Sequence, residues 1–204
     1  MFEYYMFHKP RGCITARRDD RQKTVMDYFP EEKRDVIFPV GRLDKDTEGL
    51  LIFTNDGDFC YRLMMPEYEV PKTYFFWAKG TLATEQISEI ESGVKIYKNK
   101  EFVTSFAKIS IERVETLDSI KHLLCDGELK RARKRRDTPV FCGYITITEG
   151  KKHQVKRMLA YAGCKVLYLK RIKIGELSLD EALSLGEYRR LSEAELELIK
   201  SKCI

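Results

Sequence analysis

The sequence VGRLDKDTEGL occupies residues 40–50, between two short β-rich runs, 36–40 and 49–54. It places three carboxylates and two cations at the end of a strand, where catalytic side chains are often found. If this segment is extended, the two-residue period puts Arg42 and Asp44 on one face. A guanidinium beside Asp44 would keep that carboxylate ionised and oriented, as a nucleophile requires. The stretch therefore makes Asp44 a candidate catalytic carboxylate at the end of a strand.

Two other interpretations fit the same residues. The stretch can be a polar loop with a local salt bridge, which composition alone favours. It can also hold the paired carboxylates of a hydrolase, Asp44 with Asp46 or Glu48. Closeness in sequence does not establish the separation between two carboxylates that such chemistry needs.

Short strands and helices alternate on both sides of this stretch. We expect strands at 2–8, 36–40, 49–54, 72–78, 94–97, 102–112, 141–148 and 166–174, and helices at 24–29, 58–65, 85–92, 153–162 and 192–202. Strands in groups with helices between them indicate an α+β fold with a mainly antiparallel sheet. Two prolines around a charged segment, 65–71, predict a junction between an N-terminal lobe of about 1–70 and a C-terminal lobe of about 71–204. We expect both lobes to form one domain, 1–204.

Composition excludes several classes of protein. The chain has 204 residues, of which 43% are hydrophobic and 34% charged, so it is neither disordered nor fibrous. No apolar run reaches the ~18 residues of a membrane span, and residues 1–10 do not resemble a signal peptide. The six cysteines and three histidines are dispersed, which predicts a reduced, cytoplasmic protein with no metal site.

Positive charge is concentrated in one region. Residues 128–173 hold 14 lysines and arginines against three acids, a local balance of +11 in a chain of net charge +5. The cations cluster at 130–136, 151–152, 156–157 and 170–173. Such clustering is typical of a surface that binds a polyanion, although any one cluster can be a solvated face. We expect 130–136 to be an exposed loop.

Several motifs together resemble a known family. Residues 41–51, with TNDG at 54–57, are similar to the signature of bacterial ribosomal-RNA pseudouridine synthases of the small-subunit type. Further blocks agree in order: KTY at 72–74, EGKKHQVKRM at 149–158, LKR at 169–171 through Gly175, and GEYRRL at 186–191. The resemblance implies a two-lobed catalytic domain with a central RNA-binding cleft.

That resemblance also implies a reaction and its residues. Such enzymes break the C1′–N1 bond of a uridine, rotate the base and rejoin it through C5, which requires no cofactor. Asp44 would be the nucleophile, Arg42 would hold it ionised, and Tyr74 would pack against the uracil, as a flipped base requires. A core aromatic is the alternative for Tyr74. Lys72 shares its face and can reach the carboxylate or a phosphate.

A strand-to-helix junction at 151–159 supplies the expected RNA contacts. Backbone N–H groups and cations near a helix start both favour phosphate. The substrate-binding residues expected here are Lys152, His153, Gln154, Lys156, Arg157 and Leu159. Leu159 can press against the base or belong to a buried helix face, and His153 is expected to make an RNA or structural contact rather than act as a base. Many relatives carry an arginine at the position of Lys156.

We expect a monomer that binds RNA, most simply ribosomal RNA, and no membrane. Many family members carry a small RNA-binding module ahead of the catalytic domain. The first strand here begins at residue 2, so the basic region is expected to supply the affinity. Two alternatives stay open: a non-catalytic RNA-binding or ribosome-assembly factor on the same fold, and a metal-dependent nuclease using Asp44 and Asp46.

Overall fold

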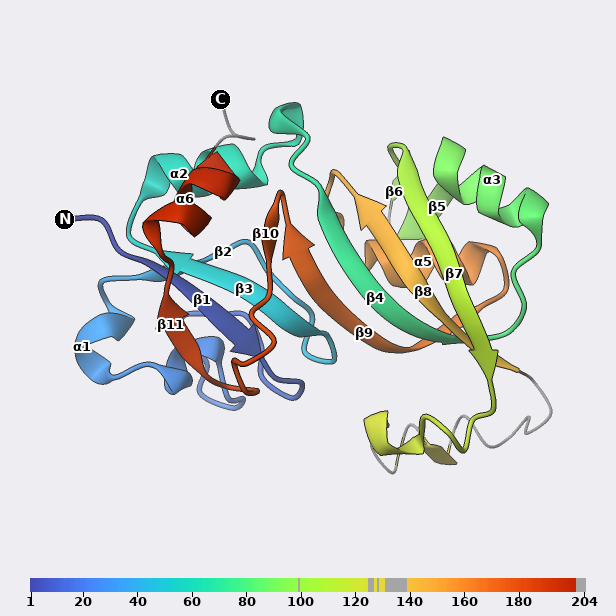
Figure 1. Cartoon of the computed structure of the whole chain (residues 1–204), viewed down its shortest axis with the longest axis horizontal. Coiled ribbons are helices and arrows are strands. Elements are labelled where there is room, and N and C mark those ends of the chain that lie inside the picture. The colour runs from blue at the N-terminus through green and yellow to red at the C-terminus, as the bar shows by residue number, and fades with distance from the viewer. Residues whose placement is uncertain (99, 125–126, 128, 131–138, 201–204) are drawn as a thin grey trace. The chain divides into compact units, whose positions relative to one another are not determined.

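The computed structural model (Figure 1) describes residues 1–98, 100–124, 127, 129–130 and 139–200. The chain forms two compact units: unit 1 combines Met1–Lys72 with the chain from Lys170 onward, and unit 2 is Thr73–Leu169. The sequence placed residues 71–204 in one lobe, whereas the chain returns to unit 1 at Lys170. It returns because β9 pairs there with β3 in parallel, with Glu48 opposite Lys170.

Unit 1 is built on a mixed sheet. Its strands are β1 (Tyr4–Lys9), β2 (Phe38–Val40), β3 (Glu48–Thr54), the second half of β9 (Lys165–Ile174), β10 (Leu177–Ser178) and β11 (Tyr188–Arg190). The order is β11-β1-β3-β9, with β2 also pairing β3 and β10 pairing β9. All these pairs are antiparallel except β3 with β9. The expected mainly antiparallel α+β sheet is confirmed in this unit.

Side chains cover both faces of β3, which explains its nearly continuous apolar sequence. On one face Met6, Leu50 and Ile52 pack with the helical residues Phe59 and Leu63. On the other face an aromatic cluster forms around Phe29, whose ring centroid lies 4.6 Å from that of Phe53 and 4.2 Å from that of Tyr188. The rings of Tyr5 and Phe7 also contact Phe29. Central β3 is therefore a rigid base for the loop that precedes it.

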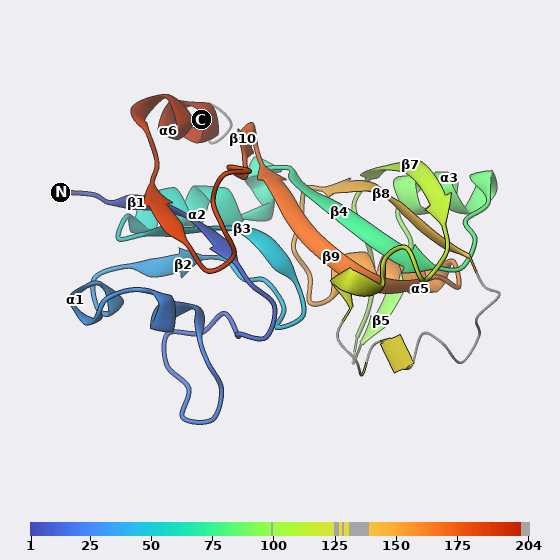
Figure 2. The same ribbon diagram turned by 60° about the horizontal axis from the view of Figure 1, so that its bottom comes forward.

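The helices of unit 1 are short. They are η1 (Val25–Tyr28), α1 (Glu31–Arg34), α2 (Gly57–Met64), η2 (Pro66–Tyr68) and α6 (Glu193–Lys200). Helix α2 begins where Asp56 accepts a hydrogen bond from the Phe59 N–H at 3.0 Å, and a capping box between Ser192 and Glu195 opens α6. Figure 1 shows α2 and α6 on the same side of the sheet, and Figure 2 shows a long loop between β1 and η1.

Unit 2 is built on a sheet flanked by helices. Its elements are β4 (Lys72–Lys79), α3 (Thr84–Ser92), the hairpin β5 (Lys95–Lys98) and β6 (Lys100–Val103), β7 (Ala107–Glu115), η3 (Lys121–Leu123), β8 (Val140–Ile147), α5 (Gln154–Tyr161) and the first half of β9. The order is β9-β4-β8-β7. In Figure 1, α5 lies behind β7 and β8, and α3 lies to the right of β7. Trp77 and Val140 on the opposite face pack with Leu117 and Ile120.

Most expected elements occur within two residues of their predicted bounds, but the single strand expected at 102–112 is wrong. Strand β6 ends at Val103 and β7 begins at Ala107. The Thr104 N–H still donates to the Val94 carbonyl at 3.0 Å, in register with the β5–β6 pairs, and the chain then leaves this ladder at Ser105, whose N–H donates to Glu149 at 2.8 Å. Residues 131–136 of the expected basic loop and the end of the expected last helix lie outside the described residues.

Among the helices that the structure describes, none has the length and apolar character that a membrane span requires. The cysteines Cys13, Cys60, Cys142 and Cys164 are free thiols. The other two cysteines lie outside the described residues.

Candidate active site

The predicted nucleophile lies in a loop between β2 and β3. Asp44 is half-buried, Arg42 is exposed, and Leu43 between them is buried, which is the alternation expected of an extended segment. The loop then turns, because the Thr47 N–H donates to the Asp44 carbonyl at 3.0 Å. Asp44 thus occupies the last extended position before the turn. The ionising role of Arg42 stays a prediction.

A buried lysine holds this loop from below. Lys9, at the end of β1, is fully buried, and its ammonium donates to the carbonyls of Asp44 at 3.1 Å, Thr47 at 2.9 Å and Pro10 at 3.0 Å. Burial lowers the pKa of Lys9, and this shift is opposed by neighbouring groups that include the carboxylates of Asp46 and Asp44. Since three carbonyls converge on one cation, the turn after Asp44 is fixed in a single conformation.

A second set of bonds fixes the residue immediately before Asp44. The Thr15 hydroxyl donates to the Leu43 carbonyl at 2.8 Å and accepts from the Leu43 N–H at 3.1 Å. The Gly12 N–H donates to the Lys45 carbonyl at 2.7 Å. Residues 9–15 therefore hydrogen-bond to the backbone of Asp44 and of the residues on both sides of it. This support was not predicted from the sequence. The feature that could have indicated it is a lysine at the end of a strand, directly before Pro10.

The far end of the loop joins β3 at a glycine that the packing requires. Gly49 has a φ of +111°, and a Cβ there would lie 2.2 Å from the carbonyl oxygen of Arg171. This close approach lets Arg171, which is buried, donate from Nε to the Leu50 carbonyl at 2.8 Å. Lys170 lies 4.0 Å from the Glu48 carboxylate. The predicted basic pair at 170–171 is thus tied to the end of the Asp44 loop.

Strand β4 carries the predicted aromatic residue. Tyr74 is 8% exposed and Lys72 is 5% exposed. Phe75 faces the other way, where its ring centroid lies 5.5 Å from that of Tyr144 and 6.3 Å from that of Trp77. The expected alternation along β4 is therefore confirmed. The role of Tyr74 in contacting uracil stays a prediction, as does that of Lys72.

In unit 2, a buried carboxylate organises the turn into α5. Glu149 accepts from the side-chain amide of Gln154 at 2.7 Å and from the Ser105 N–H at 2.8 Å. The other side of the same amide accepts from the Lys151 N–H at 2.9 Å. Gln154 is 3% exposed, so the described contacts of its amide support the turn, a role that the sequence analysis did not identify. His153 completes the turn in the left-handed region, with a φ of +56°.

This turn presents cations to the surface. Lys151, Lys152 and His153 are exposed, and Lys156 and Arg157 are half-buried on the first turns of α5. Leu159 is fully buried, which fits its alternative as part of the buried helix face. The predicted RNA-binding residues thus divide into a basic surface and two buried supports, Gln154 and Leu159.

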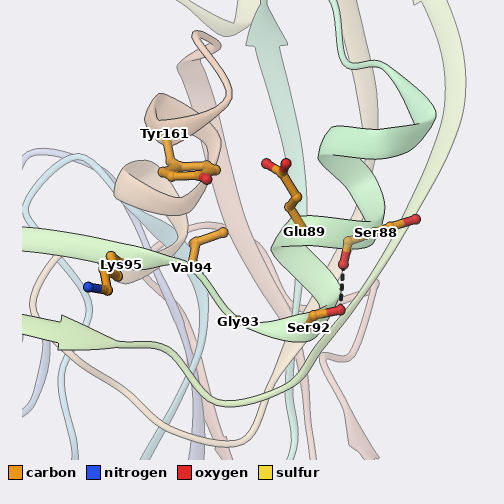
Figure 3. Close-up of a pocket in the computed structure, with 7 residues that line it drawn as sticks. All are labelled: Ser88, Glu89, Ser92, Gly93, Val94, Lys95 and Tyr161. Atoms are coloured by element: carbon orange, nitrogen blue, oxygen red, sulfur yellow. Dashed lines mark hydrogen bonds between the residues drawn. The ribbon is translucent and has the colours of Figure 1, made fainter.

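A separate cavity of about 570 Å³ lies between α3, the start of β5 and the end of α5. Its lining residues are Ser88, Glu89, Ser92, Gly93, Val94, Lys95 and Tyr161, all shown in Figure 3. The Glu89 carboxylate, opposite Tyr161, raises the pKa of that phenol. None of the predicted site residues lines this cavity. In the described ranges, no group of three or more histidine, cysteine or acidic side chains is placed to hold a metal.

Comparisons with known proteins agree on one family. The sequence profile described as RNA pseudouridylate synthase matches residues 3–161. An uncharacterized RNA pseudouridine synthase of Bacillus subtilis is 45% identical over 199 residues, which is 97% of this chain and 73% of that protein. Ribosomal small subunit pseudouridine synthase A of Pseudomonas aeruginosa is 35% identical over 193 residues, which is 95% of this chain and 72% of that protein. Ribosomal large subunit pseudouridine synthase B of B. subtilis is 33% identical, over 97% of this chain and 71% of that protein.

The solved structures support the fold. A crystal structure of a pseudouridylate synthase aligns with a TM-score of 0.77 at 31% identity, covering 98% of this chain and 74% of that one. The human RNA pseudouridylate synthase domain containing 1 aligns with a TM-score of 0.56 at 11% identity, over 98% of this chain and 91% of that one, which is a likeness of fold alone. The predicted fold class is confirmed.

Proposed function

The chain belongs to the RNA pseudouridylate synthase family, and on this premise we propose that it isomerises a specific uridine of ribosomal RNA, with Asp44 as the nucleophile. Relatives named for both ribosomal subunits support the choice of ribosomal RNA. The observation that carries the assignment of Asp44 is the support of its loop by Lys9 and Thr15. A carboxylate whose backbone is fixed in this way is pre-organised for attack. We place the reaction in the cytoplasm, where ribosomal RNA is made in bacteria.

The reaction conserves all atoms of the nucleotide. Attack by Asp44 on the ribose or on the base allows the C1′–N1 bond to break, after which the freed uracil turns to present C5. The C1′–C5 bond then forms, the Asp44 carboxylate is released, C5 loses its proton and N1 gains one. No electrons are exchanged with a second molecule. The chain therefore has to supply a nucleophile, a surface for the turning base and a path for one proton.

We assign the remaining residues by what each side chain can do. Tyr74 offers a ring to a base that has lost its stacking. Arg42, which is exposed, keeps Asp44 ionised or holds a phosphate of the flipped nucleotide. Lys72 stabilises negative charge next to Tyr74. The basic residues Lys152, His153, Lys156 and Arg157 bind the RNA backbone.

The test is the isosteric variant Asp44→Asn. We expect it to fold normally, to bind a ribosomal RNA transcript within about 3-fold of the wild type, and to lose at least ~10³-fold in turnover, because an amide is a poor nucleophile. Pseudouridine is measured by chemical mapping of the RNA. The matched control is Asp58→Asn, an exposed carboxylate in unit 1 on α2, which should turn over normally.

The alternatives make different predictions in the same assay. A non-catalytic RNA-binding factor forms no pseudouridine even as the wild type. A metal-dependent nuclease shortens the RNA and stops when a chelator is added, whereas the isomerase leaves the length unchanged. Turnover by Asp44→Asn close to that of the wild type would refute the nucleophile while leaving the family assignment intact.

A further inference from the structure

Unit 2 exposes large apolar side chains at the end of β6 and in the segment that joins it to β7. The side chain of Phe106 is 79% exposed and that of Val103 57% exposed, while Phe102 is half-buried. Among the aromatic residues whose exposure the structure describes, Phe106 is the most exposed. Removing an aromatic ring from water is favourable, so a ring kept this exposed suggests a surface that is covered by a partner.

This apolar segment is fixed next to the basic turn that leads into α5. The Ser105 N–H, between Thr104 and Phe106, donates to the buried carboxylate of Glu149 at 2.8 Å. Strand pairing places Ala107 opposite Ile147, two residues before Glu149. The ammonium of Lys151 lies 5.5 Å from the centroid of the Phe102 ring. The ring of Phe102 and the backbone next to Phe106 therefore both lie close to the turn that carries the lysines.

The charge of this surface is positive. Lys151, Lys152 and His153 are exposed on the turn, and Lys108 is exposed on β7, two residues after Phe106. The negative charge of Glu149 is turned inward, where Ser105 and Gln154 use it. A partner of opposite charge that also offers flat apolar faces would match both properties. Single-stranded RNA has this combination, because its bases stack on aromatic rings and its phosphates pair with lysine.

We propose that Phe102, Val103 and Phe106, together with Lys108, Lys151 and Lys152, bind a single-stranded segment of RNA that flanks the target uridine. We name these six residues the hairpin surface. A base stacks on Phe106, and Lys151 and Lys152 hold the adjacent phosphates. The inference rests on the proposed function for the identity of the RNA, and it adds a contact for a nucleotide that does not itself react.

The experiment compares Phe106→Ala with Phe106→Trp, and uses Val114→Ala as the matched control. Val114 is 66% exposed near the other end of β7, about 25 Å along the strand from Phe106. The probes are a fluorescein-labelled single-stranded ten-nucleotide RNA and a duplex of the same length. We expect Phe106→Ala to bind the single strand about 5- to 30-fold more weakly, the cost of one lost stacking contact. Phe106→Trp and Val114→Ala should bind within about 2-fold of the wild type.

Salt dependence separates stacking from charge. Phe106→Ala should keep the wild-type slope of log K against log salt, since it removes no phosphate contact. Lys151→Gln should reduce that slope by about 0.7, the value for one phosphate of a single strand. Unchanged binding by Phe106→Ala, or an equal loss for the single strand and the duplex, would overturn the inference. So would a normal slope in Lys151→Gln, because this lysine would then lie away from the phosphates.

The pseudouridine assay distinguishes this inference from the proposed function. If the wild type forms pseudouridine and Phe106→Ala binds RNA normally, the hairpin surface is refuted and the function stands. If the wild type forms none but its binding to single strands depends on Phe106, the surface is supported and the function is refuted. Thermal melting of each variant checks the fold, which truncation of a side chain as exposed as Phe106 should leave intact.

Discussion

The two units use positive charge in opposite ways. In unit 1 two of the cations that support the site are enclosed: Lys9 is fully buried and donates to three carbonyls, and Arg171 is 4% exposed. In unit 2 the turn before α5 keeps Lys151 and Lys152 in water. A buried cation is costly to move, so it fixes backbone, whereas an exposed cation can exchange water and counterions for phosphate. Changes in unit 1 should therefore alter turnover and stability, and changes in unit 2 should alter RNA affinity.

The largest effect is expected from Lys9→Met. The variant leaves the buried carbonyls of Asp44 and Thr47 without their donor, which should lower the free energy of unfolding by about 2–4 kcal/mol. We also expect kcat to fall about 10-fold with little change in KM, because the loop of Asp44 loses its single conformation. Urea unfolding and steady-state kinetics measure the two effects. Lys45→Met is the control: this lysine is exposed in the same loop and should cost less than about 0.5 kcal/mol.

Tyr74 offers the second test, because it belongs to unit 2 but is assigned a role in the reaction. We expect Tyr74→Leu to lose about 10- to 100-fold in kcat/KM, the equivalent of one stacking contact, and Tyr74→Phe to remain within about 3-fold. If both variants lose activity equally, the ring is not the reason for this residue. Melting temperatures measured alongside identify any loss that comes from the fold, since Tyr74 is 8% exposed.

A smaller effect is expected where the cations are exposed. The double variant Lys152→Gln and Lys156→Gln should reduce the salt slope of RNA binding by about 1.4, while kcat at saturating RNA stays near the wild-type value. Fluorescence anisotropy at several salt concentrations measures the slope. Lys121→Gln, at an exposed lysine of η3 in the same unit, is the control. A fall in kcat with an unchanged slope would reverse the contrast between the two units.

The smallest effect is expected at an arginine of unit 1 that pairs with two carboxylates. Arg189 donates to Glu195 at 2.7 Å and to Asp180 at 2.7 Å. These bonds lower the pKa of Glu195 to about 2 and also lower that of Asp180. Carboxylates with lowered pKa values stabilise the fold above their ordinary pKa values, and this contribution is lost as pH falls towards 2.

Arg189→Gln should therefore flatten the pH dependence of unfolding below pH 4.5, the ordinary pKa of a glutamate. At pH 7 we expect the melting temperature to drop by about 2 °C, because the pairs are partly exposed. Thermal melts between pH 2 and 7 measure both quantities. If the melting temperature of Arg189→Gln depends on pH as that of the wild type does, other carboxylates cause the loss of stability at low pH.

The sequence was sufficient to predict features that depend on residues close to one another along the chain. The strand at 49–54, the last helix and the shared face of Lys72 and Tyr74 are local features, so pattern and propensity were sufficient. The candidate nucleophile was found through the resemblance of residues 41–51 to a family signature. The support from Lys9 was missed because it joins residues 35 and 38 positions apart, which only the pairing of β1 with β3 brings together.

Two further differences have the same origin. The break at Thr104–Phe106 depends on Glu149, 44 residues beyond Ser105, so no local pattern marks it. The return of the chain to unit 1 at Lys170 depends on the parallel pairing of β9 with β3. Parallel pairing joins strands that are distant in sequence and leaves no turn signal between them.

Unit 1 is assembled from two segments of the chain, one before and one after unit 2, and this imposes an order on its biosynthesis. Strand β1 pairs with β11 through Tyr5 and Arg190, so this side of β1 has no partner until β11 has been synthesised. Unit 2, an uninterrupted stretch from Thr73 to Leu169, can complete its own contacts while the last strands are still unsynthesised. A newly made chain would thus complete unit 2 before the unit that carries Asp44, and we expect a nascent polypeptide stalled before β11 to form no pseudouridine.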